Sequence, residues 1–255
     1  MKWSAQHFLE LLRDMTEKEL SARYKHTVFG FLWLIANPFL QMLIIGFIFP
    51  LFIKEQVKYY YYYLFAGLLV WNFFSLSLTK TTTSIINERS LIKKAAFPRA
   101  VIPLSIICSN LINYLAAFLL FLIPLTFLHT LTILSFLYFI FGLILLIIFT
   151  VGLSLLTSAL NVRFRDINFF VQAILIVWFY ATPIIYSLDQ MPKRLHWIWR
   201  LNPLTSIMQL LQHALIGSAP PGPAMLITNG LMIISVTILG IIIFRTESKN
   251  FDDWI

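Results

Sequence analysis

The sequence predicts an all-α, polytopic membrane protein with six transmembrane helices, an N-terminal amphipathic interface helix and short external re-entrant helices. Hydrophobic residues make up 59% of its 255 residues and charged residues only 12%, and the mean hydropathy is +0.82. A soluble domain usually carries about twice that charged fraction. The apolar residues also gather in runs long enough to cross a bilayer, so one membrane domain over 1–255 accounts for the chain.

The first element expected is an amphipathic helix over 4–25. Apolar residues fall on one of its sides and charged residues surround the rest; the apolar ones are Phe8, Leu11, Leu12 and Met15. A helix of this kind lies in the membrane interface, either as a plain anchor or as a contact surface.

A helix crosses the hydrocarbon core in roughly 20 apolar residues. Six stretches meet this requirement, and we expect spans at 29–53, 61–80, 101–128, 133–160, 168–187 and 224–244. Another apolar stretch, 201–216, is too short to span. It opens on Asn202 and Pro203 and precedes Gly217, a pattern that predicts a re-entrant or interfacial helix.

The distribution of Lys and Arg predicts the orientation. With six spans, fourteen of the 19 Lys and Arg residues fall on the side that holds both termini, and five fall on the other. Cytoplasmic loops carry the excess of positive charge, so both termini are expected in the cytoplasm. The net charge of +8 mostly reflects this bias. Because the basic residues are split among separate loops, we expect no nucleic-acid partner.

Several classes of protein are disfavoured by what the sequence lacks. No acidic residue, Lys or Arg needs to lie in the middle of a span, which argues against an ion-coupled secondary transporter, although sodium sites built from carbonyls and hydroxyls remain open. There is no zinc-binding His-Glu-x-x-His pattern, and none of the nine glycines precedes a Lys, so there is no P-loop. We therefore expect no catalytic residue, no metal site and no cofactor bound by this chain.

Two loops on the side of the termini carry patterns of their own. Residues 87–98 combine helix-forming residues with a stop at Pro98, so a short helix is expected there, either to transmit movement from a soluble partner or as a local feature of a basic loop. In the next such loop Asp166 lies beside Arg163 and Arg165, which predicts an ion pair or an N-cap for the fifth span. Pro183 is expected to bend or end that span.

Five short motifs follow one another along the chain. They are Arg23-Tyr24-x-x-Thr27-x-x-Gly30-x-x-Trp33 with Asn37-Pro38, Glu88-Arg89-x-Leu91-Ile92-Lys93 with Phe97-Pro98, Asn161-Val162-x-Phe164-Arg165-Asp166, Thr182-Pro183-Ile184-x-Tyr186, and Asn202-Pro203. In order and loop position they resemble the permease subunit of ABC-2 type exporters, from residue 13 to the C-terminus. The branch most similar exports lipid-linked polysaccharides: O-antigen, capsule and teichoic acid.

The resemblance implies a homodimer in the bacterial inner membrane, with two copies of a separate ATPase subunit that binds the ATP and Mg. The 87–98 segment would be the coupling helix, and its ATPase-coupling residues would be Glu88, Arg89, Leu91, Ile92, Lys93 and Phe97. The 188–222 region would supply external gate helices. The substrate, a lipid-linked polysaccharide, would enter from the cytoplasm among membrane lipids.

The resemblance also implies a channel lined by the first and fifth spans. Residues there that offer stacking faces, hydroxyls or amides are Trp33, Asn37, Phe179, Tyr180, Thr182 and Tyr186. Arg23, Lys25 and Arg165 would meet the lipid pyrophosphate at the cytoplasmic entrance.

Three other functions remain open at this point. The same architecture could export a drug or a lipid, with no continuous sugar channel. A secondary transporter is disfavoured by the empty membrane core. A lipid-modifying enzyme would need clustered acids or histidines, and Glu88 and Asp166 stand alone in separate loops. The motifs do not choose among O-antigen, capsule and teichoic acid.

Overall fold

The computed structural model describes residues 4–25, 30–51, 59–126, 132–192, 194 and 196–254. Within these residues all regular structure is helical, which confirms the all-α prediction. The helices are α1 (Ala5–Tyr24), α2 (Trp33–Ile48), α3 (Tyr60–Asn87), α4 (Arg89–Lys94), α5 (Val101–Thr126), α6 (Ile133–Arg163), α7 (Asp166–Ala181), α8 (His196–Arg200), α9 (Pro203–Ile216), α10 (Pro223–Glu247) and α11 (Phe251–Trp254). Short 3₁₀ turns occur at Gly30–Leu32, Phe49–Leu51, Leu188–Gln190 and Ser248–Asn250.

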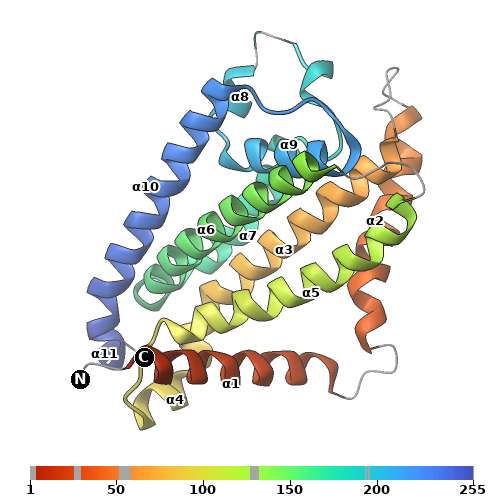
Figure 1. Cartoon of the computed structure of the whole chain (residues 1–255). Coiled ribbons are helices and arrows are strands. Elements are labelled where there is room, and N and C mark those ends of the chain that lie inside the picture. Colours follow the sequence, from red (N-terminus) through yellow and green to blue (C-terminus); the bar gives the residue numbers. More distant parts are fainter. Residues whose placement is uncertain are drawn as a thin grey trace.

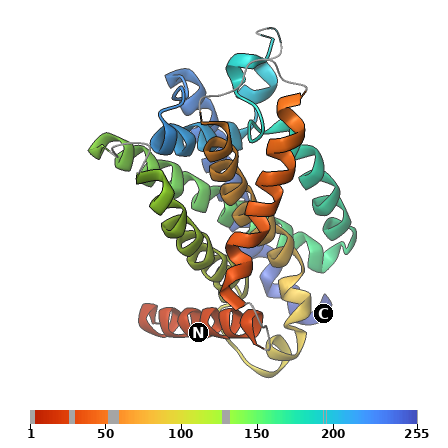
Figure 2. The ribbon, with the colours of Figure 1, turned by 90° about the vertical axis from the view of Figure 1, so that its right-hand side faces the viewer.

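The long helices form a tilted bundle that is closed at its two ends by shorter ones (Figure 1). We call the end with α1, α4 and α11 the basal face, and the end with α8 and α9 the distal face. Helix α1 runs across the basal face, at a large angle to α2 in both views (Figures 1 and 2). The first and last helices of the chain therefore lie at the same end.

Four described helices are long and apolar enough to cross a membrane. They are α3, α5, α6 and α10. The first and fifth predicted spans correspond to shorter apolar helices, Ile35–Leu51 and Ile167–Ala181. Positions 29, 52 and 53 of the first predicted span and 127–128 of the third lie outside the described residues.

Several predicted boundaries shift. Helix α3 continues to Asn87, beyond the expected end at residue 80, and the hydroxyls of Thr81 and Thr82 donate to the Leu78 carbonyl within the helix. The predicted fifth span, 168–187, is wrong at its end: α7 stops at Ala181, since Thr182 is extended and Pro183 cannot continue the helix. The structure also corrects the cap of α7. Asp166 is its first residue, and the side chain of Asn161 accepts a bond from the Asn168 backbone N–H at 3.2 Å.

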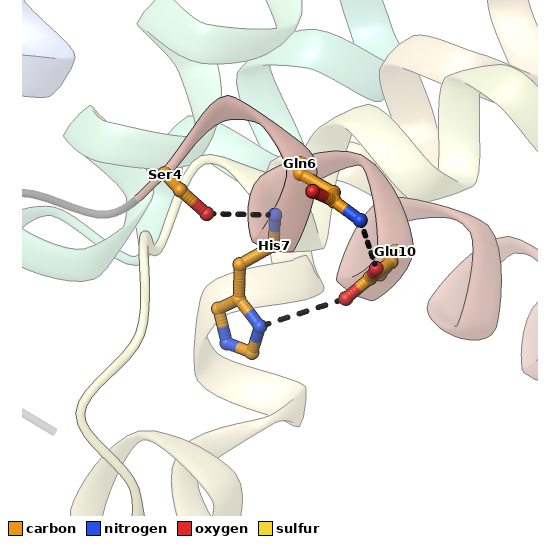
Figure 3. Close-up of polar contacts among 4 residues, drawn as sticks. All are labelled: Ser4, Gln6, His7 and Glu10. Atoms are coloured by element: carbon orange, nitrogen blue, oxygen red, sulfur yellow. Dashed lines mark hydrogen bonds and ion pairs between the residues drawn. The ribbon is translucent and has the colours of Figure 1, made fainter.

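Ser4 caps the start of helix α1: its hydroxyl accepts a bond from the His7 backbone N–H at 3.2 Å (Figure 3). In the same turn the Gln6 amide donates to Glu10, and the His7 ring lies 3.9 Å from the Glu10 carboxylate. The apolar side predicted for this helix packs against the bundle, with Met15 buried among Ile85, Val101 and Phe251. The predicted helix is thus confirmed, and its apolar side packs on the bundle of the chain itself; its place in the membrane interface stays a prediction.

Helix α3 is the centre of the bundle, in contact with α2, α5, α6, α7 and α9. In the most apolar 18-residue stretch of α3, 72% is buried, whereas the corresponding share for α10 is 17%. The Phe74 ring stacks on Phe149 of α6 at 5.8 Å and meets the edge of Trp178 of α7 at 5.4 Å. Aromatic packing of this kind fixes how the neighbouring helices lie on α3.

Helices α6 and α10 approach each other through glycine. A Cβ added at Gly240 would lie 2.1 Å from the Gly152 carbonyl oxygen, and one at Gly152 would lie 2.6 Å from the Thr237 Cα. Thr237 adds a bond from its hydroxyl to the Ile148 carbonyl, at 3.1 Å. Small residues allow this close contact of two apolar helices.

Helix α9 forms inside the stretch predicted at 201–216. Asn202 caps its start, with Pro203 as the first helical residue, and Gly217 ends it in the left-handed conformation with φ +71°. The helix is mostly buried at the distal end of the bundle, against α6, α3 and α10.

Candidate functional site

A polar cavity of about 580 Å³ lies where the end of α1 meets α2, α3 and α5. The residues that matter for its chemistry are Arg23, Trp33, Lys80, Asn72, Asn110 and Asn113. They come from four helices, and the two cations are contributed by α1 and by the basal half of α3. Among the described residues that line the cavity there is no Asp or Glu.

Arg23 and Tyr24 attach the end of α1 to α5. The Arg23 guanidinium donates to the Asn110 Oδ1, and the Asn110 amide donates in turn to the Ser77 hydroxyl at 3.0 Å. The Tyr24 hydroxyl donates to the Asn113 Oδ1 at 2.8 Å. Burial raises the pKa of Tyr24, so its phenol stays protonated and remains the donor.

Two donors in this cavity are unused within the described residues. The Lys80 ammonium makes no hydrogen bond or ion pair there, and the buried Asn113 Nδ2 has no partner. Asn113 is only 6% exposed. The Glu19 carboxylate does not line the cavity but interacts electrostatically with Lys80. A buried amide N–H without an acceptor is costly, and together with the two cations it favours an anionic group in the cavity.

The predicted entrance residues do not stay together. Arg23 lines the cavity, but Lys25 and Arg165 are exposed and do not. The structure brings Lys80 to Arg23 instead, with Asn110 and Asn113. Sequence reasoning missed these three, although Asn110 and Asn113 form a polar pair at helical spacing inside an apolar span, which is the signal that could have found them.

The predicted channel residues lie in three different settings. Trp33 and Asn37 are exposed and line the polar cavity. Tyr180 is 60% exposed on α7, while the neighbouring Phe179 is half-buried, with its ring 5.4 Å from Trp71. Helices α2 and α7 both pack on α3.

Thr182 and Tyr186 belong to a hydrogen-bonded cluster at the distal end. Asn202 accepts a bond from the Trp178 indole at 2.8 Å and donates to the Thr182 hydroxyl at 3.0 Å. Thr182 is fully buried, so in the single chain it joins α7 to α9 and presents no surface to a channel. Tyr186 accepts from the Trp199 indole at 2.9 Å and donates to the Tyr180 carbonyl at 2.8 Å.

Helix α4 presents two sides. Ile92 is buried against the basal core, while Leu91 and Phe97 are half-buried beside it. Arg89 and Lys93 are exposed. Ile92 is therefore placed to hold α4 on the bundle, whereas the exposed residues are the ones free to meet a partner.

An ion pair joins α4 to α1. The Lys18 ammonium lies 2.7 Å from the Glu88 carboxylate, seventy positions along the chain. The predicted coupling residue Glu88 thus connects two basal helices within the chain itself.

No group of three or more His, Cys, Asp or Glu side chains that could hold a metal occurs in the described part of the chain. Cys108 is a free thiol on α5.

The chain is similar to known membrane proteins over most of its length. The ABC-2 type transporter family model matches residues 10–216. An O-antigen export system permease protein RfbA of Klebsiella pneumoniae is 38% identical over 214 residues, which cover 82% of this chain and 81% of the relative. A protein of the same name from Myxococcus xanthus is 32% identical over 216 residues, covering 79% of this chain and 78% of the relative.

Proposed function

This chain belongs to the ABC-2 type transporter family, and on that premise we propose that it is the permease subunit of an ATP-driven exporter of lipid-linked, O-antigen-like polysaccharide. ATP would be hydrolysed by two copies of a separate ATPase subunit. The exporter would lie in the bacterial inner membrane, where the polymer is moved away from the cytoplasm.

The proposal assigns the basal face to the cytoplasm. Helices α3, α5, α6 and α10 would cross the membrane together with the shorter α2 and α7, giving six spans. The bias of Lys and Arg toward the side of the termini supports this orientation. Helix α1 would then lie in the cytoplasmic interface, and α8 and α9 would form the external gate.

Two chains would enclose the sugar channel between their α2 and α7 helices. Support comes from polar and aromatic side chains on the exposed sides of these helices. Asn37 and Trp33 are exposed on α2, and Gln172 and Tyr180 are exposed on α7. A primary amide in the middle of a short apolar helix is costly against lipid, so it favours a wet, protein-lined surface.

The observation that carries the substrate class is the cationic cavity. Arg23 and Lys80 share it close to the basal face, and no carboxylate is among its described lining residues, although Glu19 interacts electrostatically with Lys80 from outside the lining. A diphosphate that links a polymer to its lipid would find there two cations and an unused amide donor. A neutral lipophilic drug would leave these groups without a counter-ion.

The proposal also gives α4 the role of coupling helix. Its exposed side carries Arg89 and Lys93, and its buried residue Ile92 ties it to the spans. Through the pair of Lys18 with Glu88, movement of α4 would reach α1 as well.

Deleting the gene in its own bacterium and restoring it with variants tests the function. With the gene absent, surface polysaccharide should be lost and lipid-linked polymer should accumulate in the cell. Arg23→Ala should lower export by at least about tenfold, because a charge-assisted contact is lost, and Arg23→Lys should retain part of it.

The matched control is Arg13→Ala on the same helix, whose guanidinium is exposed and pairs with Glu17 at 2.9 Å. It should export at the wild-type level. Normal surface polysaccharide in the deletion strain would contradict the function, and full export by Arg23→Ala at normal protein abundance would remove Arg23 from the substrate path.

A further inference from the structure

We propose that the distal face binds the headgroups of anionic phospholipids in the external leaflet of the membrane. The binding surface, which we call the α8 patch, consists of Arg194, His196, Trp197 and Arg200. Its ligand is a lipid phosphate that carries a net negative charge, as in phosphatidylglycerol. The inference rests on the orientation proposed above, with the distal face external, but not on what the permease exports.

The α8 patch surrounds a hollow of about 290 Å³. Arg194 and Arg200 are exposed, and Trp197 is 60% exposed. Neither arginine forms an ion pair with another described residue. Two guanidinium groups beside one hollow suit a phosphate, because each offers a planar fork of N–H donors that matches the phosphate oxygens.

The position of these cations runs against the charge bias of the chain. With six spans, only five of the 19 Lys and Arg residues fall on the side away from the termini. Three of those five lie within residues 193–200, namely Lys193, Arg194 and Arg200. Because external loops normally hold few cations, this local cluster indicates an anionic partner on that side.

An apolar edge beside the cations indicates that the partner is a membrane surface. Ile198 is 38% exposed and Leu201 is 55% exposed. Successive residues of a helix are about 100° apart, so Trp197 falls between Arg200 and Leu201 around the axis of α8. Cations, then a tryptophan, then aliphatic residues is the order in which side chains meet the phosphates, the interface and the acyl chains.

The neighbours of α8 also place it beside lipid. Figure 1 shows α8 at the distal end of α10, and the two helices are in contact. Helix α10 is the least buried of the four long apolar helices, and its distal half exposes Ile227, Leu231 and Ile234. An aliphatic surface of this kind suits acyl chains, so α8 adjoins a side of the bundle that faces lipid.

The patch is fixed to the rest of the distal face by Trp199. Its indole donates to the Tyr186 hydroxyl at 2.9 Å, and Tyr186 donates to the Tyr180 carbonyl of α7 at 2.8 Å. The His196 ring nitrogen lies 3.1 Å from the Met191 carbonyl oxygen. A patch held in this way binds a headgroup at a lower cost in ordering. A bound headgroup is thereby connected to the distal end of α7.

Quenching of Trp197 by brominated lipid tests the inference on the purified chain in nanodiscs. Brominated phosphatidylglycerol or brominated phosphatidylcholine is mixed into unlabelled phosphatidylcholine at equal fractions. The signal of Trp197 is the difference between the unaltered chain and Trp197→Phe. Phosphatidylglycerol should bind beside Trp197 about tenfold more tightly than phosphatidylcholine, and Arg194→Gln combined with Arg200→Gln should abolish this preference.

The matched control removes two exposed charges from the basal face, through Arg245→Gln combined with Lys249→Gln. It should keep the full preference. Replacing Arg194 and Arg200 by lysine should keep part of it, because the charges stay while the paired donors are lost. Thermal midpoints should not differ, since the altered residues are exposed. Equal quenching by the two lipids in the unaltered chain, or an unchanged preference after both glutamine changes, would overturn the inference.

An acidic sugar is the other ligand that two arginines and a tryptophan could hold. An oligogalacturonate is therefore added to the same nanodiscs as a competitor. At a concentration equal to that of phosphatidylglycerol, it should leave the quenching of Trp197 unchanged. Displacement of the lipid by the sugar would assign the patch to the polymer and would overturn its assignment to the membrane.

The lipid measurement needs neither ATP nor polymer, so its failure is distinguishable from failure of the proposed function. A complex that exports polymer while its patch shows no lipid preference overturns only the assignment of the patch. A chain that prefers phosphatidylglycerol at the patch but exports no polymer in the presence of its ATPase contradicts only the proposed function.

Discussion

At the scale of single residues, Asn202 contacts three helices, two of them through its side-chain amide. The amide oxygen caps α9 by accepting from the Leu204 backbone N–H at 3.1 Å, and it accepts from the Trp178 indole of α7. The backbone carbonyl of Asn202 accepts from the Asn229 amide of α10 at 3.2 Å. Because these groups are buried, the distal end of the bundle depends on this side chain being present.

Asn202→Ala is therefore expected to destabilise the protein by about 2–4 kcal/mol, since it removes a helix cap and leaves the buried indole N–H without its acceptor. The thermal unfolding midpoint of the purified protein measures this. Asn250→Ala, at an exposed residue of the basal face, is the matched control and should leave the midpoint unchanged. Equal midpoints for the two variants would contradict the role of Asn202.

Predictability at this scale depended on whether a residue sits in a local motif. Asn202-Pro203 and Arg23 were found because short motifs contain them. Lys80 and Asn113 were not, because their importance comes from helices that are distant in sequence and meet around one cavity. The predicted cap at Asp166 was wrong for a different reason: the same short motif holds Asn161, and it is the Asn161 side chain that accepts from the Asn168 backbone N–H in the first turn of α7.

At the scale of elements, the close contact of α6 and α10 requires small residues where the two helices meet. The Gly240 Cα faces the Gly152 carbonyl so closely that even a methyl group has no room. Gly230 lies on α10 as Gly240 does, but a Cβ added at Gly230 would have no atom within 4 Å. The pair gives a matched test of helix packing against helix propensity.

Gly240→Ala is expected to destabilise the protein by about 1–3 kcal/mol or more through overpacking, with loss of folded protein in the membrane. Gly230→Ala should stabilise it by up to about 1 kcal/mol, because alanine favours a helix more than glycine does. Folded yield and thermal midpoint in detergent decide the matter. Similar behaviour of the two variants would mean that α6 and α10 are not packed through Gly152 and Gly240.

Helix α4 offers a test that separates docking from folding. Arg89→Glu and Lys93→Glu, both at exposed residues, should weaken association with the ATPase subunit by about tenfold while the thermal midpoint stays unchanged. Ile92→Asp should lower the midpoint itself, because it buries a carboxylate. Lys249→Glu is the control for charge alone, and co-purification with the ATPase is the readout.

If Arg89→Glu and Lys93→Glu bind the ATPase as tightly as the unaltered chain, α4 is not the docking surface.

The ion pair of Lys18 and Glu88, at 2.7 Å, should contribute little to the free energy of unfolding, since Lys18 is largely exposed. Its expected contribution is to movement: Lys18→Glu should lower ATPase activity coupled to transport, and adding Glu88→Lys should restore it.

At the scale of the whole molecule, hydropathy predicted the architecture well. The all-α class, the basal amphipathic helix and the helix near 201–216 could all be expected from apolar periodicity and caps. The ends of the apolar helices could not, because hydropathy does not register where a chain turns. Helix α3 runs on to Asn87, beyond the end expected from hydropathy. The end of α7 at Ala181 is the exception, because Pro183 was expected to bend or end that span. Among the described helices, four meet the length of a span.

The large exposed apolar surface is consistent with a chain that lives in lipid and meets a second copy. Helix α10 exposes mainly aliphatic side chains, Leu231 and Ile242 among them, whereas α7 mixes Tyr180 and Gln172 with apolar residues. A cysteine at Tyr180, in a Cys108→Ser background, should therefore cross-link two chains in the membrane, and a cysteine at Leu231 should not. Cross-linking only at Leu231 would place the homodimer on the opposite side of the bundle.

The measurement that tests the central claim most directly is transport by the purified chain in lipid vesicles, with and without its ATPase subunit. Alone, the chain should neither hydrolyse ATP nor move polymer. With the ATPase subunit, lipid-linked polysaccharide should cross the membrane only when ATP is supplied, and Arg23→Ala should reduce this transport by about tenfold. ATP hydrolysis by the chain alone, or a complex that hydrolyses ATP but moves no lipid-linked polysaccharide, would contradict the account.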